Sequence, residues 1–257
     1  LSVDAKVCAI VRNGERVDSL AAGEQGEIVL NVTPFYAEMG GEVGDTGTIT
    51  ADGVELQVID TKAPEKGLVC HVATVASGTL AVGMAVSAQV DAKRRACIAR
   101  NHTCTHILHA ALRQVLGAHV KQAGSYVGPD RLRFDFTHFE SVTPEQLKQV
   151  EELANSVIMS ATATNIFETS LAKAREEGVT ALFGEKYGDV VRVVKVGDFS
   201  SELCGGCHVA NTAEIGLVKI VSESSVGANL RRIEAFTSYD ALAYLNGFEH
   251  QMKELSA

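Results

Sequence analysis

The first 90 residues carry short apolar runs separated by glycine and aspartate. The runs are rich in valine, isoleucine and leucine, and no helical period of useful length interrupts them. This pattern predicts a small antiparallel β-barrel or sandwich over residues 1–90. The clearest runs lie at 27–32, 55–60, 68–75 and 85–90.

A glycine-rich segment, Pro34 to Gly47, interrupts this β-type region. It lacks the GKS or GKT ending of a loop that cradles phosphate. We therefore interpret its glycines as turn residues or as points of close backbone packing.

The pattern changes near Asp91. Residues 91–116 are dense in helix formers and contain no proline, and Gly117 fits the position just after a helix end. We expect one long helix here, or two abutting ones. Thr143-Pro-Glu-Gln is a capping box with proline in the first turn, and it predicts a helix to about Met159.

Strands and helices alternate through the rest of the chain, so the expected fold class is α+β. Its three parts are a β-barrel domain at 1–90, an α+β core at 91–236 and a terminal helix at 237–257. The further elements expected are strands at 132–136, 164–168 and 190–196, a helix from Ser170 ended by Gly178, a hairpin of 216–222 with 229–236, and a helix from Tyr239.

Composition fits a folded protein that is neither secreted nor membrane-spanning. The chain has 257 residues, 46% hydrophobic and 21% charged, which excludes disorder and collagen. It contains no apolar run of about 18 residues and no secretory signal. The 6 cysteines are too scattered for a disulfide scaffold, so we expect a reducing, cytoplasmic location. Leu1 enters partway through a strand pattern, which predicts a piece of a longer protein.

The net charge of −9 argues against non-specific affinity for nucleic acid, and we expect no DNA partner. Local basic clusters nevertheless occur at 93–95 with Arg100, at Lys121 with Arg131 and Arg133, and at 231–232. Taken singly, each cluster is more simply interpreted as a solvated face.

Two pairs of residues with four-residue spacing carry candidate chemistry. His102 and His106 project from one face of the expected helix, a weak signal alone, because such pairs are often ordinary helix residues. Cys204-Gly-Gly-Cys-His208 adds a thiolate and an imidazole in a glycine-rich loop. Three histidines and one cysteine suit tetrahedral zinc.

Two other functions fit these motifs poorly. Zinc proteases place a glutamate after the first histidine of HExxH, whereas Thr103 stands there. Cys204 and Cys207 form a CxxC pair, but redox chemistry needs the first cysteine at a helix start, and the residues that follow predict no helix.

Taken with their surroundings, these motifs resemble the editing region of alanyl-tRNA synthetases across essentially the whole chain. Short metal motifs alone would also fit threonyl-tRNA synthetase editing domains and free-standing alanyl editing proteins. One departure is Cys207, where the family usually has threonine, so an extra thiol could compete for the metal. The matching segments are the HxxxH at 102–106, the CxxxH at 204–208, the glycine-rich run 35–45, and the runs 109–117, 181–188 and 231–235.

The resemblance implies a function and a set of partners. Residues 1–90 would be the barrel before a zinc-binding editing core, and the aminoacylation domain, with its ATP site, would lie outside this chain. The expected reaction is zinc-dependent hydrolysis of serine or glycine wrongly attached to tRNA(Ala), with His102, His106, Cys204 and His208 holding Zn2+. A competing interpretation is a tRNA-binding module of the ligase in which zinc is structural, because four protein ligands close a tetrahedral site.

The resemblance and the helical spacing also suggest residues that contact the substrate. Thr105 lies on the edge of the histidine face and could bind the serine hydroxyl, although a hydroxyl bonded back to the preceding turn is about equally plausible. Gln122 matches a glutamine of the family's editing pocket. No general base is identifiable. The expected tRNA contacts are Lys93, Arg94, Arg95, Arg100 and Lys121.

Overall fold

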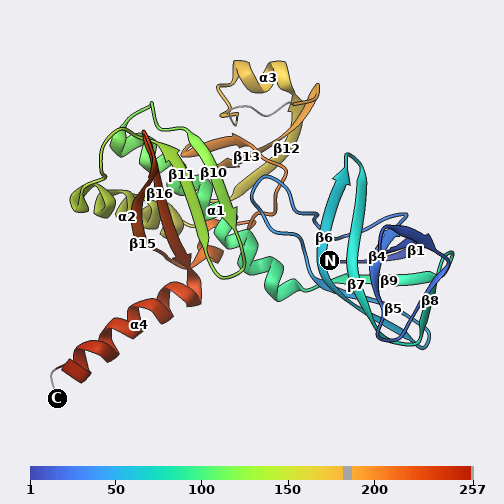
Figure 1. The fold of residues 1–257 in the computed structure, drawn as a ribbon. Coiled ribbons are helices and arrows are strands. Elements are labelled where there is room, and N and C mark those ends of the chain that lie inside the picture. The colour runs from blue at the N-terminus through green and yellow to red at the C-terminus, as the bar shows by residue number, and fades with distance from the viewer. Residues whose placement is uncertain (182–186, 256–257) are drawn as a thin grey trace. The chain divides into compact units, whose positions relative to one another are not determined.

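The computed structural model describes residues 1–181 and 187–255. Its contacts divide the chain into two compact units, Leu1–Ala96 and Cys97–Ala257 (Figure 1). The first unit is all β apart from the start of a helix, and the second is mixed. The predicted α+β class is confirmed. Part of the 181–188 run lies outside the described residues.

The first unit is a closed antiparallel barrel of six strands, with a seventh short strand beside it. Closure depends on β1, which pairs with β4 at one end and with β9 at the other. Strands β3 and β8 pair with each other and form a separate two-stranded sheet. The strands are β1 (Ser2–Arg12), β2 (Glu15–Val17), β3 (Ser19–Ala21), β4 (Gln25–Leu30), β5 (Gly47–Ala51), β6 (Val54–Glu65), β7 (Leu68–Ser77), β8 (Thr79–Ala81) and β9 (Ala85–Val90).

Alternation along these strands fills the barrel, as the apolar pattern predicts. In β6, Val54, Leu56 and Val58 are buried while the residues between them face outward. Ile28 and Ile49 from other strands are also fully buried in the same core. Successive side chains of a strand point to opposite faces, so every second residue lines the interior.

The glycine-rich segment closes tightly onto the barrel. Gly40 and Gly41 adopt φ of 62° and 89°, the left-handed region that favours glycine. A Cβ on Gly44 would collide with the Thr61 carbonyl oxygen. Both interpretations of this segment, turn residues and close packing, are confirmed.

The second unit combines two antiparallel sheets with helices. A four-stranded sheet has the order β10-β11-β16-β15, and a three-stranded sheet has the order β12-β13-β14. The strands are β10 (Gln122–Val127), β11 (Leu132–Thr137), β12 (Thr164–Ser170), β13 (Val190–Val196), β14 (Ser200–Leu203), β15 (Val218–Gly227) and β16 (Leu230–Thr237). The helices are α1 (Ala92–Leu116), α2 (Pro144–Met159), α3 (Leu171–Glu176), the 3-10 turn η1 (Thr212–Ile215) and α4 (Ser238–Leu255).

Helices α1 and α2 share one apolar core with the four-stranded sheet. Leu108 and Leu112 of α1, Phe134 and Phe136 of β11 and Val150 of α2 belong to this core and are fully buried. The single helix α1 therefore has a rigid support. Among the described residues, no helix is both long enough and apolar enough to cross a membrane.

Candidate metal centre

The middle of α1 is buried on every side and yet strongly polar. Every residue from 101 to 109 is buried. This stretch includes three histidines, and buried polar groups need partners. The partners of His102, Thr103 and His109 come from the segment in and after β14. The polar residues concerned are Asn101, His102, Thr103, Thr105, His106 and His109.

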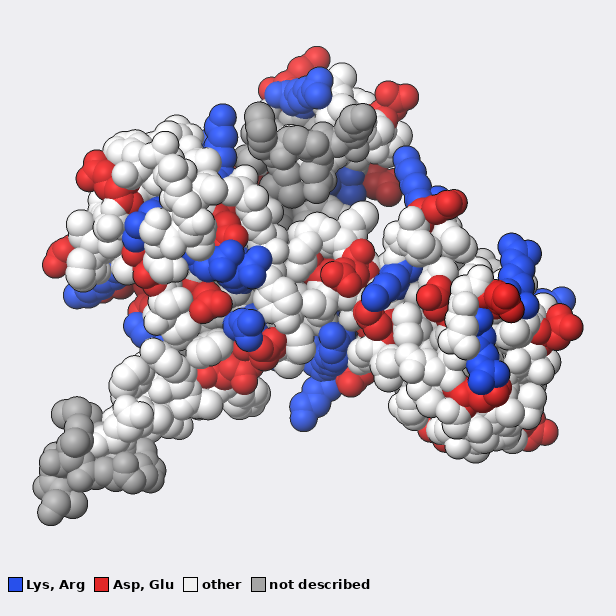
Figure 2. Space-filling model, in the orientation of Figure 1, with Lys and Arg blue, Asp and Glu red and all other residues white. Residues whose placement is uncertain are grey.

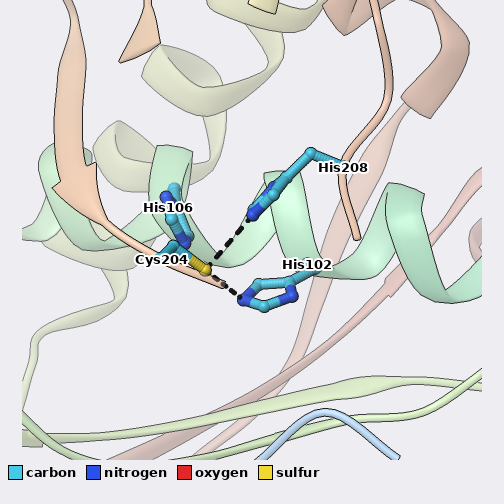
Figure 3. A group of neighbouring side chains, drawn as sticks. All are labelled: His102, His106, Cys204 and His208. Carbon is cyan, nitrogen blue, oxygen red and sulfur yellow. Dashed lines mark hydrogen bonds between the residues drawn. The ribbon is translucent and has the colours of Figure 1, made fainter. Parts of the chain in front are cut away.

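Four side chains from these two segments converge (Figure 3). His102 and His106 project from α1, while Cys204 and His208 come from the loop after β14. The Cys204 Sγ lies 3.4 Å from His102 Nε2 and 3.3 Å from His208 Nε2. All four candidate ligand atoms lie within 4.8 Å of one another. We call this group the His3Cys cluster.

The spacing of the His3Cys cluster suits a small tetrahedral cation. Zinc bonds of about 2.0 Å to nitrogen and about 2.3 Å to sulfur place neighbouring ligand atoms roughly 3.3 to 3.6 Å apart. The two sulfur-nitrogen distances in the structure, 3.3 and 3.4 Å, agree with that spacing. Histidine and cysteine are also the donors that zinc prefers. The cluster therefore fits a metal ion.

The electrostatics of the cluster produce the protonation states that bind metal. Burial alone would raise the pKa of the Cys204 thiol, but the neighbouring His102 and the hydrogen bonds from the histidines bring it far below its usual value. Burial, reinforced by His102, lowers the pKa of His208 to about 3. A thiolate and a neutral imidazole are the ligating forms of these side chains.

Arg192 of β13 fixes the shape of the loop that carries Cys204. Its Nη1 donates to the carbonyl oxygens of Cys204 at 2.9 Å and of Gly206 at 2.8 Å. The backbone N–H of Gly206 points to the Cys204 sulfur at 3.4 Å. Cys207 packs against the apolar core and is outside the His3Cys cluster.

Two residues outside the predicted ligand set, Thr103 and Glu202, lie beside the cluster. Thr103 places its Oγ1 3.0 Å from His208 Nδ1 and accepts the backbone N–H of Val209. Glu202 accepts a hydrogen bond from His109 Nδ1 at 3.0 Å. The sequence held one signal for Glu202, because it stands only two residues before the candidate ligand Cys204.

The two predicted substrate-contacting residues lie outside this group of four. Thr105 is 3% exposed, and its hydroxyl donates to the Asn101 carbonyl oxygen at 2.8 Å. Gln122 is half-buried on β10, and its Nε2 donates to Ser125 Oγ at 3.3 Å. The back-bonded alternative for the Thr105 proton is therefore the one observed.

The predicted tRNA-contacting residues divide into two groups. Arg94 and Arg95 bond within the first unit, to the Gly44 carbonyl and to the Asp45 carboxylate. In the second unit, Arg100 donates to the Glu214 carbonyl at 3.0 Å. The ammonium-bearing residues Lys93 and Lys121 are exposed. On the face drawn in Figure 2, basic and acidic side chains are interspersed in each unit.

Comparisons with known families agree with this arrangement. Residues 1–94 match the family described as tRNA synthetases class II (A). Residues 191–234, which contain Cys204 and His208, match the threonyl and alanyl tRNA synthetase second additional domain. The fold and the site thus define a segment of a class II aminoacyl-tRNA synthetase that carries this additional domain.

The individual relatives narrow this class. Alanine-tRNA ligase of Pelotomaculum thermopropionicum is 54% identical over 256 residues, covering 100% of this chain and 29% of the relative. The same ligase of Acetivibrio thermocellus is 52% identical over 252 residues, which is 98% of this chain and 29% of that protein. The chain belongs to the alanyl-tRNA synthetase family, and it spans 29% of the length of these curated relatives.

Proposed function

We propose that this chain is the editing part of an alanine-tRNA ligase and removes serine or glycine wrongly attached to tRNA(Ala). The observation that carries the proposal is the His3Cys cluster: His102 and His106 come from α1, and Cys204 and His208 come from the segment that matches the second additional domain. The family and the names of the relatives support tRNA as the partner.

The cluster residues and the buried part of α1 would have different roles in the reaction. His102, His106, Cys204 and His208 would hold zinc, which supplies a Lewis acid for the ester carbonyl or lowers the pKa of water. Burial of α1 between residues 101 and 109 keeps bulk solvent from that side of the site.

For serine, selectivity against alanine would follow from one hydroxyl group. Serine is larger than alanine, so exclusion by size cannot protect the correctly charged product. A pocket that pairs with the serine hydroxyl can reject the analogue lacking it by up to about 10⁴-fold, because its own polar groups would otherwise go unpaired. We propose that the Thr105 hydroxyl oxygen accepts a hydrogen bond from the serine hydroxyl. It would act as an acceptor because its own proton is donated to the Asn101 carbonyl oxygen. Gln122 is the other proposed contact.

One observation favours the competing proposal, a tRNA-binding module with structural zinc. Four protein donors complete a tetrahedral site, whereas catalytic zinc usually keeps one position open. The two proposals differ in hydrolysis, because only the first releases the amino acid.

The test uses the purified 257-residue chain with seryl-, glycyl- and alanyl-tRNA(Ala). We expect about one zinc per chain and release of serine and glycine faster than alanine. Cys204→Ala should lose both metal and hydrolysis, while the matched Cys207→Ala should keep both, because Cys207 is outside the His3Cys cluster. Metal binding without hydrolysis would favour the structural role. Metal loss on Cys207→Ala alone would overturn the ligand assignment.

A further inference from the structure

A buried carboxylate lies beside the His3Cys cluster without belonging to it. Glu202 is 5% exposed and stands on β14, two residues before Cys204. Its Oε1 accepts the Nδ1–H of His109 at 3.0 Å and a weaker bond from Ser200 Oγ at 3.4 Å. Burying a charge is costly unless it is paired and hydrogen-bonded. A carboxylate at this position therefore indicates that it interacts with the groups around it.

The second oxygen of Glu202 faces a metal-ligand candidate. Oε2 lies 3.9 Å from His106 Nδ1, and both residues are buried. Within the described residues, His106 Nδ1 has no hydrogen-bond partner. A buried imidazole N–H without an acceptor costs about 1 to 3 kcal/mol, and Glu202 Oε2 is an acceptor within reach of a small side-chain adjustment.

The contact between Glu202 and His106 determines which ring nitrogen of His106 faces the cluster. Because Nδ1 faces Glu202, Nε2 is the nitrogen that the ring offers to the cluster (Figure 3). His208 has the same arrangement with both contacts at hydrogen-bond distance. Its Nε2 faces the Cys204 sulfur, and its Nδ1 lies 3.0 Å from Thr103 Oγ1. In both residues one nitrogen faces inward and the other faces a group that can accept its proton.

We infer that Glu202 is a positioning residue that accepts the Nδ1 proton of His106 and so fixes the tautomer whose Nε2 ligates the metal. His109 holds the carboxylate in place through its own Nδ1–H. A carboxylate behind a ligating imidazole orients the ring and makes it a stronger donor, and losing such a partner weakens metal affinity by about 10- to 100-fold. This inference rests on the proposed metal centre.

The first experiment measures zinc affinity of the full chain by competition with a chromogenic chelator. Glu202→Gln keeps the size of the side chain but replaces the charged acceptor with a neutral amide. We expect zinc to bind about 10- to 100-fold more weakly. The matched control is Glu168→Gln, an exposed position on β12 in the same unit, which should bind zinc like the wild type. Equal affinity in Glu202→Gln and wild type would overturn the inference.

The second experiment needs no variant and therefore does not depend on whether Glu202→Gln folds. Nitrogen-15 NMR of the zinc-loaded wild type reports which ring nitrogen of His106 carries the proton. We expect a protonated, slowly exchanging Nδ1. A proton on Nε2 would contradict the assignment. Failure of the wild type to bind zinc would remove the metal centre itself, whereas Glu202-dependent binding without ester hydrolysis would remove only the proposed activity.

Discussion

Replacing Thr105 with valine tests how the proposed deacylase would distinguish serine from alanine. Thr105 is 3% exposed and its hydroxyl donates to the Asn101 carbonyl oxygen at 2.8 Å. Thr105→Val removes the hydroxyl while nearly preserving volume. Because the hydroxyl proton is already committed, the oxygen can serve a substrate only by accepting a hydrogen bond. Serine can donate that bond, and alanine and glycine cannot.

The two consequences of Thr105→Val differ in size. The lost bond goes to the backbone of the same helix, so we expect the free energy of unfolding to change by no more than about 1 kcal/mol. A substrate hydrogen bond made in the transition state contributes about 1 to 3 kcal/mol, which corresponds to a loss of about 5- to 150-fold in kcat/KM for seryl-tRNA. Hydrolysis of glycyl-tRNA should change little. Zinc content should stay the same.

The assay compares seryl-, glycyl- and alanyl-tRNA hydrolysis at equal metal loading. Thr48→Val is a matched control, since this residue is half-buried on β5 in the other unit. An unchanged ratio of seryl to glycyl hydrolysis in Thr105→Val would refute the substrate contact. The hydrogen bond to Asn101 would then be the whole role of the Thr105 hydroxyl.

Three further predictions concern other parts of the chain. In metal-free protein at pH 6 to 7, iodoacetamide should modify Cys204, because its pKa is lowered and the thiolate persists. It should not modify the fully buried Cys104, because burial raises the pKa of that thiol. Labelling of Cys104 in folded protein would contradict this prediction. Asp45→Ala should lower the free energy of unfolding of the first unit by about 3 kcal/mol, measured by urea denaturation, because it removes the carboxylate that neutralises the mostly buried Arg95 guanidinium; a loss below about 1 kcal/mol would contradict it. Lys121→Ala should reduce the salt slope of tRNA binding by about 1, and an unchanged slope would show that this exposed lysine contacts no phosphate.

Local signals in the sequence predicted several elements closely. The capping box at Thr143 is present in the structure, and α2 runs from Pro144 to Met159 as expected. The β-branched run Val190–Val196 is a strand with those bounds. In each case the determinant, a cap or a run of strand-forming residues, lies within the element itself, so no distant partner is needed to recognise it.

Elements that depend on distant partners were missed or left open. Strand β10 has the sequence Gln-Ala-Gly-Ser-Tyr-Val, which carries little apolar alternation, and it is a strand because it pairs with β11. The choice between barrel and sandwich also stayed open. It depends on β1 bonding to both β4 and β9, and β9 lies more than seventy residues along the chain.

The candidate site divides in the same way. Two four-residue spacings picked out four side chains, and the structure brings these four side chains together. Charge clustering could not show that Arg95 bonds to Asp45, because the aspartate lies fifty residues away in sequence. Nor could it show Glu202 beside His109, a pairing across 93 positions. Spacing identifies ligands that share an element, whereas the groups that orient those ligands become visible only once the elements are packed.

The unequal burial of the His3Cys cluster bears on how a substrate could reach it. His102 and His106 are buried on a helix that is packed against the core, whereas Cys204 and His208, on the loop, are only partly buried. Under the proposed function, an aminoacyl ester would therefore approach from the loop side. Arg192 holds that loop through the carbonyl oxygens of Cys204 and Gly206, and Thr103 holds it through His208. The exposed side of the cluster therefore has a defined conformation. If the site is catalytic, the position that opens should be on this side, because the helix cannot shift one histidine without disturbing the packing of its neighbours.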